Sequence, residues 1–330
     1  MIELRDIRKS FRRVRRKKGM AAAAAALFRR DYEEIRALDG ISFALGRGEI
    51  AGFIGPNGAG KSTAIKIMGG ILVPDSGECT ILETCPWKNR RNYVGRIGVV
   101  FGQRTQLWWD VPVRDSLDLL RDIYRVPEGR FRENLGELAA LLDLGPLLPV
   151  PLRQLSLGQR MRCEIAASLI HDPEILFLDE PTIGLDAVSK LAVRRVIGEL
   201  NRIRRVTVIL TSHDMDDIEA LTDRILLIGR GKILYDGPLR KLRERFDRKR
   251  RLELSFEAAG GPPPELPEPM GTRLLSRGES RAVWELDTGV LSVSAALRIL
   301  GEGLSVTDMS AGSRPIEEII ASLYQEGGLG

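Results

Sequence analysis

The sequence predicts an α/β fold with a mostly parallel sheet. Short apolar runs at 175–178, 206–210 and 225–228 alternate with stretches of helical spacing, which is the pattern of buried strands joined by crossover helices. Another such run, at 50–54, leads into a glycine-rich loop at 55–60. With 330 residues and 43% hydrophobic content, the chain can form one large domain and a small one.

The N-terminal segment predicts a hairpin that is interrupted by an insertion. Apolar residues from Ile2 onward begin a strand that we expect to end near Phe11, and 41–45 forms a second strand. Between them, an alanine run with basic flanks predicts an inserted helix with a flexible lead, over about 12–35. Residues 12–30 hold eight Lys or Arg and no acid, which leaves 42 basic against 45 acidic residues elsewhere. The basic balance of the chain therefore comes from this segment.

A helical subdomain and a small accessory module follow. Apolar positions recur at helical spacing from Asp115 onward, and a turn near Pro127 divides them into helices. The proline-rich stretch at 260–269 excludes helix and central strand. Beyond the sheet, we expect a mixed β/α module from the segments 251–257, 282–287, 293–299 and 304–308, ending in a helix at 316–324. The expected divisions are a large domain at 1–246 with the helical subdomain at about 112–170, a basic strand and proline-rich linker at 247–269, and the module at 270–330.

Composition excludes several classes of protein. The longest apolar run, 20–28, is far shorter than the roughly eighteen residues that cross a bilayer, and the N-terminus lacks the features of a signal peptide. Three cysteines and two histidines, His171 and His213, make a disulfide scaffold or a His/Cys metal site unexpected. We expect a soluble protein of a reducing compartment.

The glycine-rich loop has the spacing of a phosphate-binding loop. The sequence GPNGAGKS lies after a strand and before a helix that we expect to begin near Ser62. The backbone N–H groups of such a loop turn toward phosphates, and the helix N-terminus adds partial positive charge. We expect Lys61 to contact the terminal phosphates of a nucleotide and Ser62 to ligate Mg²⁺. The expected nucleotide-binding residues of the loop are Gly55, Pro56, Asn57, Gly58, Ala59, Gly60, Lys61, Ser62 and Thr63.

Two acids end the buried strand at 175–178. Adjacent carboxylates at such a place are costly unless they organise a cation or a water. Asp179 suits the shell of Mg²⁺, and Glu180 suits the polarisation of an attacking water in phosphoryl transfer. Alone, the pair would indicate a plain strand end, but the phosphate-binding loop upstream favours the catalytic interpretation.

The pentapeptide LSLGQ, at 155–159, is a third motif. Ser156 as a helix N-cap, followed by Gly158, leaves N–H donors at the helix start, and such a helix start binds anions. With GPNGAGKST, VVFGQR, LFLDEPTIGLD and TSHD, this motif resembles the nucleotide-binding subunits of ABC transporters in order and spacing over about 1–245. The resemblance implies a P-loop NTPase fold with a mostly parallel core sheet, an antiparallel β subdomain and a helical subdomain, and an ATPase that uses ATP and Mg²⁺.

The resemblance also implies roles for single residues. Gln103 would contact Mg²⁺ and the attacking water, and His213 would contact the γ-phosphate. The motif of one chain would serve the ATP of a second chain in a head-to-tail dimer, so that two chains share two sites. The residues expected to act across that dimer are Ser156, Gly158, Gln159 and Asp186. His171 is expected to be structural.

Two departures from the family pattern matter. Position 157 is leucine where glycine is commonest, which is tolerable because the phosphate donors are Ser156 and Gly158. The insertion separates two candidates for the aromatic that stacks on adenine. Phe11 is in the expected sequence position and is favoured, Tyr32 lies at the far end of the insert, and either ring could instead only pack the hairpin.

The partners follow from the resemblance to the export-type branch that works with a separately encoded ABC-2 permease. We expect a homodimer, with a related second subunit as the alternative, at the cytoplasmic face of the plasma membrane. Trp108 and Trp109 would dock the permease or else pack inside. The basic insert would contact anionic lipid or the permease, or stay solvated. The alternative function is a soluble ABC ATPase of ribosomes or nucleic acid, but the chain lacks fused domains, coiled coils and interleaved aromatics, so no nucleic acid is expected.

Overall fold

The computed structural model describes residues 1–14, 32–102, 104–212, 214–246, 249–257, 270–300, 305–313 and 316–326. The chain divides into two compact units, Met1–Pro238 and Leu239–Gly330. Gln103, His213 and the expected inserted helix at 15–31 lie outside the described residues. Among the helices within the described ranges, none is both long enough and apolar enough to cross a membrane.

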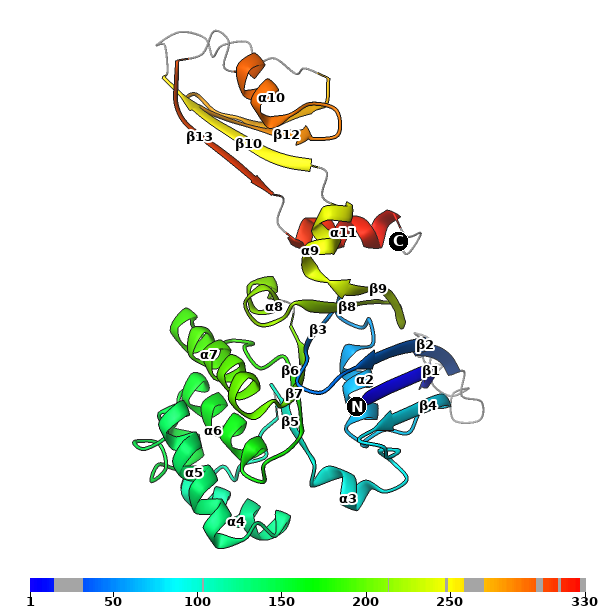
Figure 1. Ribbon diagram of the computed structural model, residues 1–330, viewed down its shortest axis with the longest axis vertical. Helices are drawn as coiled ribbons and strands as arrows, with labels where there is room; N and C mark the ends of the chain where they lie inside the picture. The colour runs from blue at the N-terminus through cyan, green and yellow to red at the C-terminus, as the bar shows by residue number, and fades with distance from the viewer. Residues whose placement is uncertain are drawn as a thin grey trace, which may run out of the picture. The chain divides into compact units, whose positions relative to one another are not determined.

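A six-stranded sheet forms the centre of the first unit (Figure 1). Its order is β5-β6-β7-β3-β8-β9, in which the first five strands are parallel and β9 is antiparallel to β8. The strands are β3 (Ile50–Ile54), β5 (Ile97–Phe101), β6 (Ile175–Asp179), β7 (Thr207–Thr211), β8 (Arg224–Gly229) and β9 (Lys232–Pro238). The expected parallel strands are confirmed. Because the carboxyl ends of parallel strands meet at one edge, the loops after β3, β6 and β7 come together there.

A second, antiparallel sheet has the order β2-β1-β4, from β1 (Ile2–Val14), β2 (Tyr32–Leu45) and β4 (Ser76–Ile81). The expected strand end near Phe11 and start at 41 are wrong, because the β1–β2 ladder continues to the pair Val14–Tyr32. Opposite charges face each other along this extension, Arg12 across from Glu34 and Arg13 across from Glu33, which favours strand pairing. The flanks 12–14 and 32–35, expected within the insert, are therefore strand.

Helices flank both sheets. They are α2 (Lys61–Met68), α3 (Arg90–Val94), α4 (Val113–Tyr124), α5 (Glu128–Leu142), the 3-10 turn η1 (Leu152–Gln154), α6 (Leu157–Leu169), α7 (Ala187–Arg204) and α8 (Met215–Leu221). Pro127 directly precedes α5, as the expected turn requires, because its fixed φ suits a helix start. Figure 1 shows α5, α6 and α7 on one side of the large sheet and α2 with the antiparallel sheet on the other. Phe53 of β3 and Phe43 of β2 pack in the core between them, with ring centroids 5.9 Å apart.

The second unit holds a four-stranded antiparallel sheet of order β11-β12-β10-β13 with α10 against one face. Its elements are α9 (Leu239–Phe246), β10 (Lys249–Phe256), β11 (Thr272–Arg277), β12 (Arg281–Asp287), α10 (Val293–Leu300), β13 (Val306–Ser313) and α11 (Ile316–Glu326). The structure places α9 in this unit, whereas the sequence analysis ended the large domain at 246. The strand β10 covers the expected basic strand, which the sequence analysis counted with the module as 251–257. Leu252 and Leu254 of β10 are buried beside Trp284 of β12, so β10 is an inner strand of the sheet.

Candidate active site

The loop between β3 and α2 has the backbone that a phosphate site needs. Gly60 has φ +116°, and a Cβ at this position would lie 2.5 Å from the carbonyl oxygen of Ala37, so only glycine fits. No side chain caps the N-terminus of α2. The first N–H groups of a helix lack partners within the helix, so this helix start is available to an anion.

Lys61 begins α2 and is almost fully buried, 6% exposed. Its Nζ donates to the carbonyl oxygens of Gly55, at 2.6 Å, and Pro56, at 3.3 Å. Burial lowers the pKa of Lys61, and the nearby carboxylates of Glu180 and Asp179 oppose this change. The ammonium group is thus held at the centre of the loop, where phosphates of a nucleotide would bind.

Ser62, Asp179 and Thr211 bring three oxygen atoms together from three elements. The hydroxyl of Ser62 donates to Oδ1 of Asp179 at 3.1 Å, and the hydroxyl of Thr211 donates to the same oxygen at 2.7 Å. A carboxylate beside a hydroxyl, next to a phosphate site, is the set of hard oxygen donors that Mg²⁺ prefers. Ser62 and Asp179 therefore fit the metal-binding role expected of them.

Glu180 follows β6 in a left-handed conformation, with φ +57°. Its N–H is bonded to Thr211, with 3.0 Å to the hydroxyl and 3.2 Å to the carbonyl oxygen. The N–H of Gly102, the residue before Gln103, donates to the carbonyl oxygen of Asp179 at 2.8 Å. The strand that leads to Gln103 therefore ends beside both acids.

Lys61, Ser62 and Glu180 line one groove of about 750 Å³. Asp179 lines a recess of about 310 Å³ that shares Ser62 and Glu180 with this groove. Phe11 lines the groove together with Ile35 and Ala37 of β2, whereas Tyr32 is 52% exposed and is not among the lining residues. The lining comprises Phe11, Ile35, Ala37, Gly55, Pro56, Asn57, Gly58, Gly60, Lys61, Ser62, Thr63, Glu180 and Ile183. The groove thus joins an aromatic end to a phosphate end.

Ser156 is the N-cap of α6, and Gln159 completes a capping box. The N–H of Gln159 donates to the hydroxyl of Ser156 at 3.3 Å, and the N–H of Ser156 donates to Oε1 of Gln159 at 2.9 Å. Two of the four unpaired N–H groups at the helix start are satisfied in this way. The N–H groups of Leu157 and Gly158 remain available to an anion. Gln159 therefore has a positioning role, because its capping box fixes the start of α6.

A family model described as "ABC transporter" matches residues 38–183. The ABC transporter ATP-binding protein NatA of Bacillus subtilis (strain 168) is 31% identical over 210 residues, which cover 64% of this chain and 85% of NatA. The chain belongs to the ABC transporter ATP-binding proteins. As a member of that family it binds ATP and is an ATPase.

Two further comparisons extend the family likeness. The Nod factor export ATP-binding protein I of Ralstonia nicotianae (strain ATCC BAA-1114 / GMI1000) is 34% identical over 210 residues, covering 63% of this chain and 64% of that protein. A dimeric structure of a post-hydrolysis state of the ATP-binding cassette MJ0796, bound to ADP and Pi, has a TM-score of 0.59 at 25% identity and covers 72% of this chain and 99% of that chain. The large unit is therefore an ABC ATPase domain.

The motif LSLGQ at 155–159, called the signature from here on, has a glycine, Gly158, that packs against its own chain. A Cβ on Gly158 would lie 2.2 Å from the hydroxyl oxygen of Ser189 on α7. Ser189 is in turn fixed by Asp186, the N-cap of α7, which accepts from its N–H and its hydroxyl, both at 2.9 Å. The starts of α6 and α7 therefore fit together tightly, and Asp186 helps to place the signature.

The segment after Gln103 is fastened to α6 by a buried acid that the sequence analysis missed. Glu164 accepts from the hydroxyl of Thr105 and from the N–H of Gln106, the latter at 3.2 Å. Burial raises the pKa of Glu164, which these hydrogen bonds oppose. The sequence feature that could have indicated this contact is a single acid among the apolar residues of α6.

The two tryptophans that follow Gln106 are partly exposed. Trp108 and Trp109 are 40% and 46% exposed, and the guanidinium of Arg160 lies 4.4 Å from the ring centroid of Trp109.

His171 lies in a structural setting. Its ring stacks on Tyr124 with centroids 3.9 Å apart, and its Nε2 is 2.9 Å from the carbonyl oxygen of Ile97. Burial lowers the pKa of His171.

Thr211 and a buried acid on α8, Asp217, are further polar residues that the sequence analysis did not select. The sequence around these two residues gives little indication of a role, because most of their side-chain contacts are with residues distant in the sequence.

Proposed function

We propose that this chain is the ATP-hydrolysing motor subunit of an ABC-2 type exporter, in which two chains share each ATP. The observation that carries the proposal is the separation of two anion sites in one chain. Lys61 and Glu180 line the groove, yet none of the described residues that line it comes from 155–159. The signature helix start, with its two remaining N–H groups, then requires a phosphate held by a second chain.

The surface beside the signature supports a dimer. Leu157 is 41% exposed, and Val188 and Leu191 on the first turns of α7 are 78% and 63% exposed. These apolar side chains flank Ser156 and Asp186, the residues expected to cross the interface. Apolar groups gathered beside polar groups at such a place are typical of a contact with another protein.

The geometry of the described residues supports the following roles in hydrolysis. Lys61 and the N–H groups of the loop hold the phosphates, and Ser62 with Asp179 would hold Mg²⁺, which neutralises charge on the transferred phosphoryl group when bound. Glu180 orients the attacking water and accepts its proton. Ser156 and Gly158 of the other chain complete the γ-phosphate site. Gln103 and His213 keep their proposed roles as the contact to metal and water and the contact to the γ-phosphate.

The permease partner is proposed from the relatives and from the exposed tryptophans. The Nod factor export protein is named for export. A recess of about 500 Å³ beside Trp109 is lined by α6 and by the segment after Gln103, so a membrane partner docked there would contact both the signature helix and the segment that leads from the ATPase site. This docking would hold the chain at the cytoplasmic face of the membrane. These relatives give no support to a function on ribosomes or nucleic acid.

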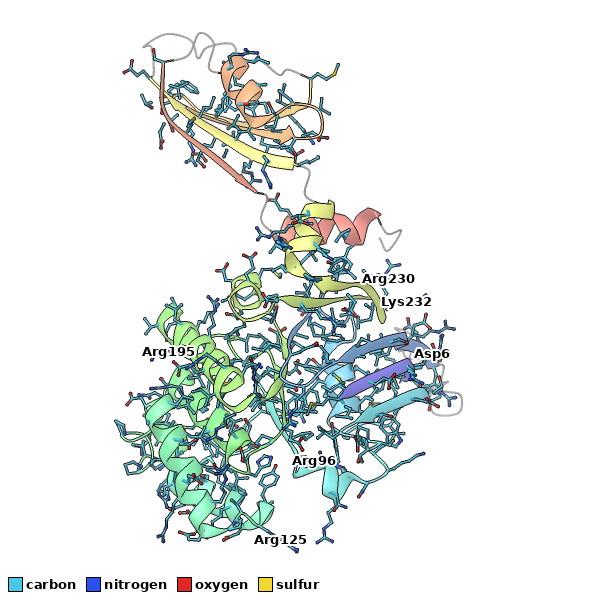
Figure 2. The ribbon with its side chains drawn as sticks, in the orientation of Figure 1. Asp6, Arg96, Arg125, Arg195, Arg230 and Lys232 are labelled. Carbon is cyan, nitrogen blue, oxygen red and sulfur yellow. The ribbon has the colours of Figure 1, made fainter. Side chains whose placement is uncertain are left out.

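The test is the variant Glu180→Gln. We expect it to abolish ATP turnover and to run as a dimer in gel filtration with ATP, because bound ATP closes the dimer and only hydrolysis reopens it. The control is Glu174→Gln, which removes an acid just before the same strand. Glu174 pairs with Arg96, labelled in Figure 2, at 2.7 Å, away from the groove. A monomer of Glu180→Gln with ATP, or retained turnover, would contradict the proposal.

A further inference from the structure

Asp217 on α8 is a fully buried carboxylate, 0% exposed, that accepts hydrogen bonds from three side chains. The hydroxyl of Thr182 donates to Oδ2, the hydroxyl of Ser212 donates to the same oxygen at 3.3 Å, and Nε of Arg194 donates to Oδ1. Thr182 and Ser212 are themselves buried. A carboxylate is an acceptor only, so it matches three donors in a way that a neutral amide cannot.

The three donors come from three segments of the ATPase site. Thr182 lies two residues after Glu180, Ser212 directly follows β7, and Arg194 is on α7, the helix that Asp186 caps. The Ser212 hydroxyl also accepts from the N–H of Asp214 at 3.0 Å, so both residues that flank position 213 in the sequence are joined to this cluster. One buried acid therefore ties the turn after β6 and the loop after β7 to α7.

The turn after β6 requires such an anchor. A left-handed conformation is strained at a residue other than glycine, and Glu180 adopts it with φ +57°. Thr211 holds the N–H of Glu180, and the turn then closes through Ile183 N–H to Glu180 O at 3.3 Å. Within this turn, the side chain of Thr182 is fixed by Asp217. Loss of that bond would let the turn relax toward ordinary φ values and move the carboxylate of Glu180.

We propose that Asp217 is a positioning residue for hydrolysis, which acts through Thr182 to hold Glu180 in its reactive place. The proposal rests on the proposed function, in which Glu180 accepts the proton of the attacking water. Arg194 on α7 binds the carboxylate of Asp217 and also lies 3.7 Å from the carboxylate of Asp214. A displacement of α7 is therefore transmitted through Asp217 to the turn that carries Glu180. Asp217 itself is not among the residues that line the groove, so its effect is on kcat rather than on ATP binding.

Thr182→Val is the informative variant. It removes one donor and keeps the shape, while Asp217 keeps Ser212 and Arg194, so no buried charge is left unpaired. The control is Thr222→Val at the C-cap of α8, the helix of Asp217, which removes another buried hydroxyl, bonded to the carbonyl oxygen of Ile218 at 3.0 Å. Both variants lose one buried hydrogen bond, but only Thr182 is next to the turn of Glu180.

We expect Thr182→Val to lower kcat by about 10- to 100-fold with an unchanged KM for ATP, because a small misplacement of a catalytic group costs up to that much. Thr222→Val should keep the wild-type kcat, and Thr182→Ser, which keeps the donor, should restore it. Ser212→Ala is the second variant should Thr182→Val not fold, with the same direction of effect on kcat. In a Glu180→Gln background, which lacks turnover, Thr182→Val should leave the ATP-dependent dimer in gel filtration unchanged, because ATP binding does not depend on the Thr182 bond.

Four results would overturn the inference. A wild-type kcat in Thr182→Val, an equal loss in Thr222→Val, or a raised KM with unchanged kcat would each assign Asp217 a structural role only. Loss of the ATP-dependent dimer when Thr182→Val is added to Glu180→Gln would show that the Thr182 bond supports ATP binding or dimerisation rather than the place of Glu180. These outcomes differ from failure of the proposed function, which would appear as normal turnover in Glu180→Gln alone.

Discussion

The hydroxyl of Ser62 and the carboxylate of Asp179 lie 3.1 Å apart although 117 residues separate them in the sequence. Ser62 is on the first turn of α2 and Asp179 ends β6, so the parallel sheet brings them to one edge. The same carboxylate oxygen accepts from Thr211 at 2.7 Å, which fixes its orientation. This pair, beside the phosphate-binding loop, is the proposed place for a divalent cation.

Asp179→Asn tests that assignment. The amide keeps the size of the side chain but removes the negative charge, so Mg²⁺ should bind poorly and turnover should fall by about 100-fold or more. ATP binding in the presence of a chelator should stay close to wild type, because Lys61 and the loop are intact. Calorimetry with and without Mg²⁺ separates the two effects. An unchanged gain in ATP affinity from Mg²⁺ would show that Asp179 is not a ligand.

Gly158→Ala tests the fit between α6 and α7. The new Cβ would lie 2.7 Å from Cβ of Ser189, so we expect a loss of about 1–3 kcal/mol in the free energy of unfolding. Gly198→Ala within α7 has no atom within 4 Å and should gain about 0.5–1 kcal/mol. Adding Ser189→Gly to Gly158→Ala should recover stability. Urea unfolding of the variants measures this, and equal effects of the two alanines would refute the contact.

Phe11→Ala and Tyr32→Ala decide which aromatic stacks on adenine. Stacking of a base on an aromatic ring contributes about 1–3 kcal/mol, so loss of the Phe11 ring should weaken ATP binding roughly 5- to 150-fold. Tyr32→Ala should leave the affinity unchanged, because Tyr32 pairs with Val14 beyond the lining of the groove. Fluorescent nucleotide titration gives both dissociation constants. Weakened binding in Tyr32→Ala alone would reverse the assignment.

Glu164 should make the stability of the protein depend on pH. Burial raises its pKa above the ordinary value of 4.5, so the folded protein binds this proton more tightly than the unfolded chain. The stability that the proton contributes is full below pH 4.5 and is lost as the pH rises through the folded pKa. Wild type should therefore lose unfolding free energy relative to Glu164→Gln from this pH toward neutrality. Denaturant unfolding across that range checks it, and a constant difference would contradict it.

Sequence alone predicted those parts of the site whose contacts are local. Lys61 and Ser62 follow a strand, a glycine-rich loop and a helix start that are adjacent in the chain, and Ser156 with Gln159 forms a capping box within four residues. Asp217 and Glu164 were not selected, because each becomes a candidate mainly through distant partners. Thr182 and Arg194 are 35 and 23 residues from Asp217, and Thr105 is 59 residues from Glu164. Their function depends on tertiary contacts that no local pattern encodes.

The same limit applies to the fold. The parallel strands were predicted because buried strands read as apolar runs. The extension of β1 to Val14 was not predicted, because it depends on cross-strand pairs such as Arg12 with Glu34. The strand at 251–257 was predicted, but its place between β12 and β13 was not, because that place depends on pairing with residues distant in the sequence.

The central claim is that each ATP is held by Lys61 of one chain and Ser156 of another. We would mix two inactive variants, Lys61→Ala and Ser156→Asp, and measure ATP turnover of the mixture. Asp keeps the N-cap but places negative charge against the phosphate. A mixed dimer then contains one intact site, formed by Lys61 of the Ser156→Asp chain and Ser156 of the Lys61→Ala chain. A site shared between two chains predicts turnover well above the sum of the separate variants, and a mixture no more active than that sum would refute the shared site.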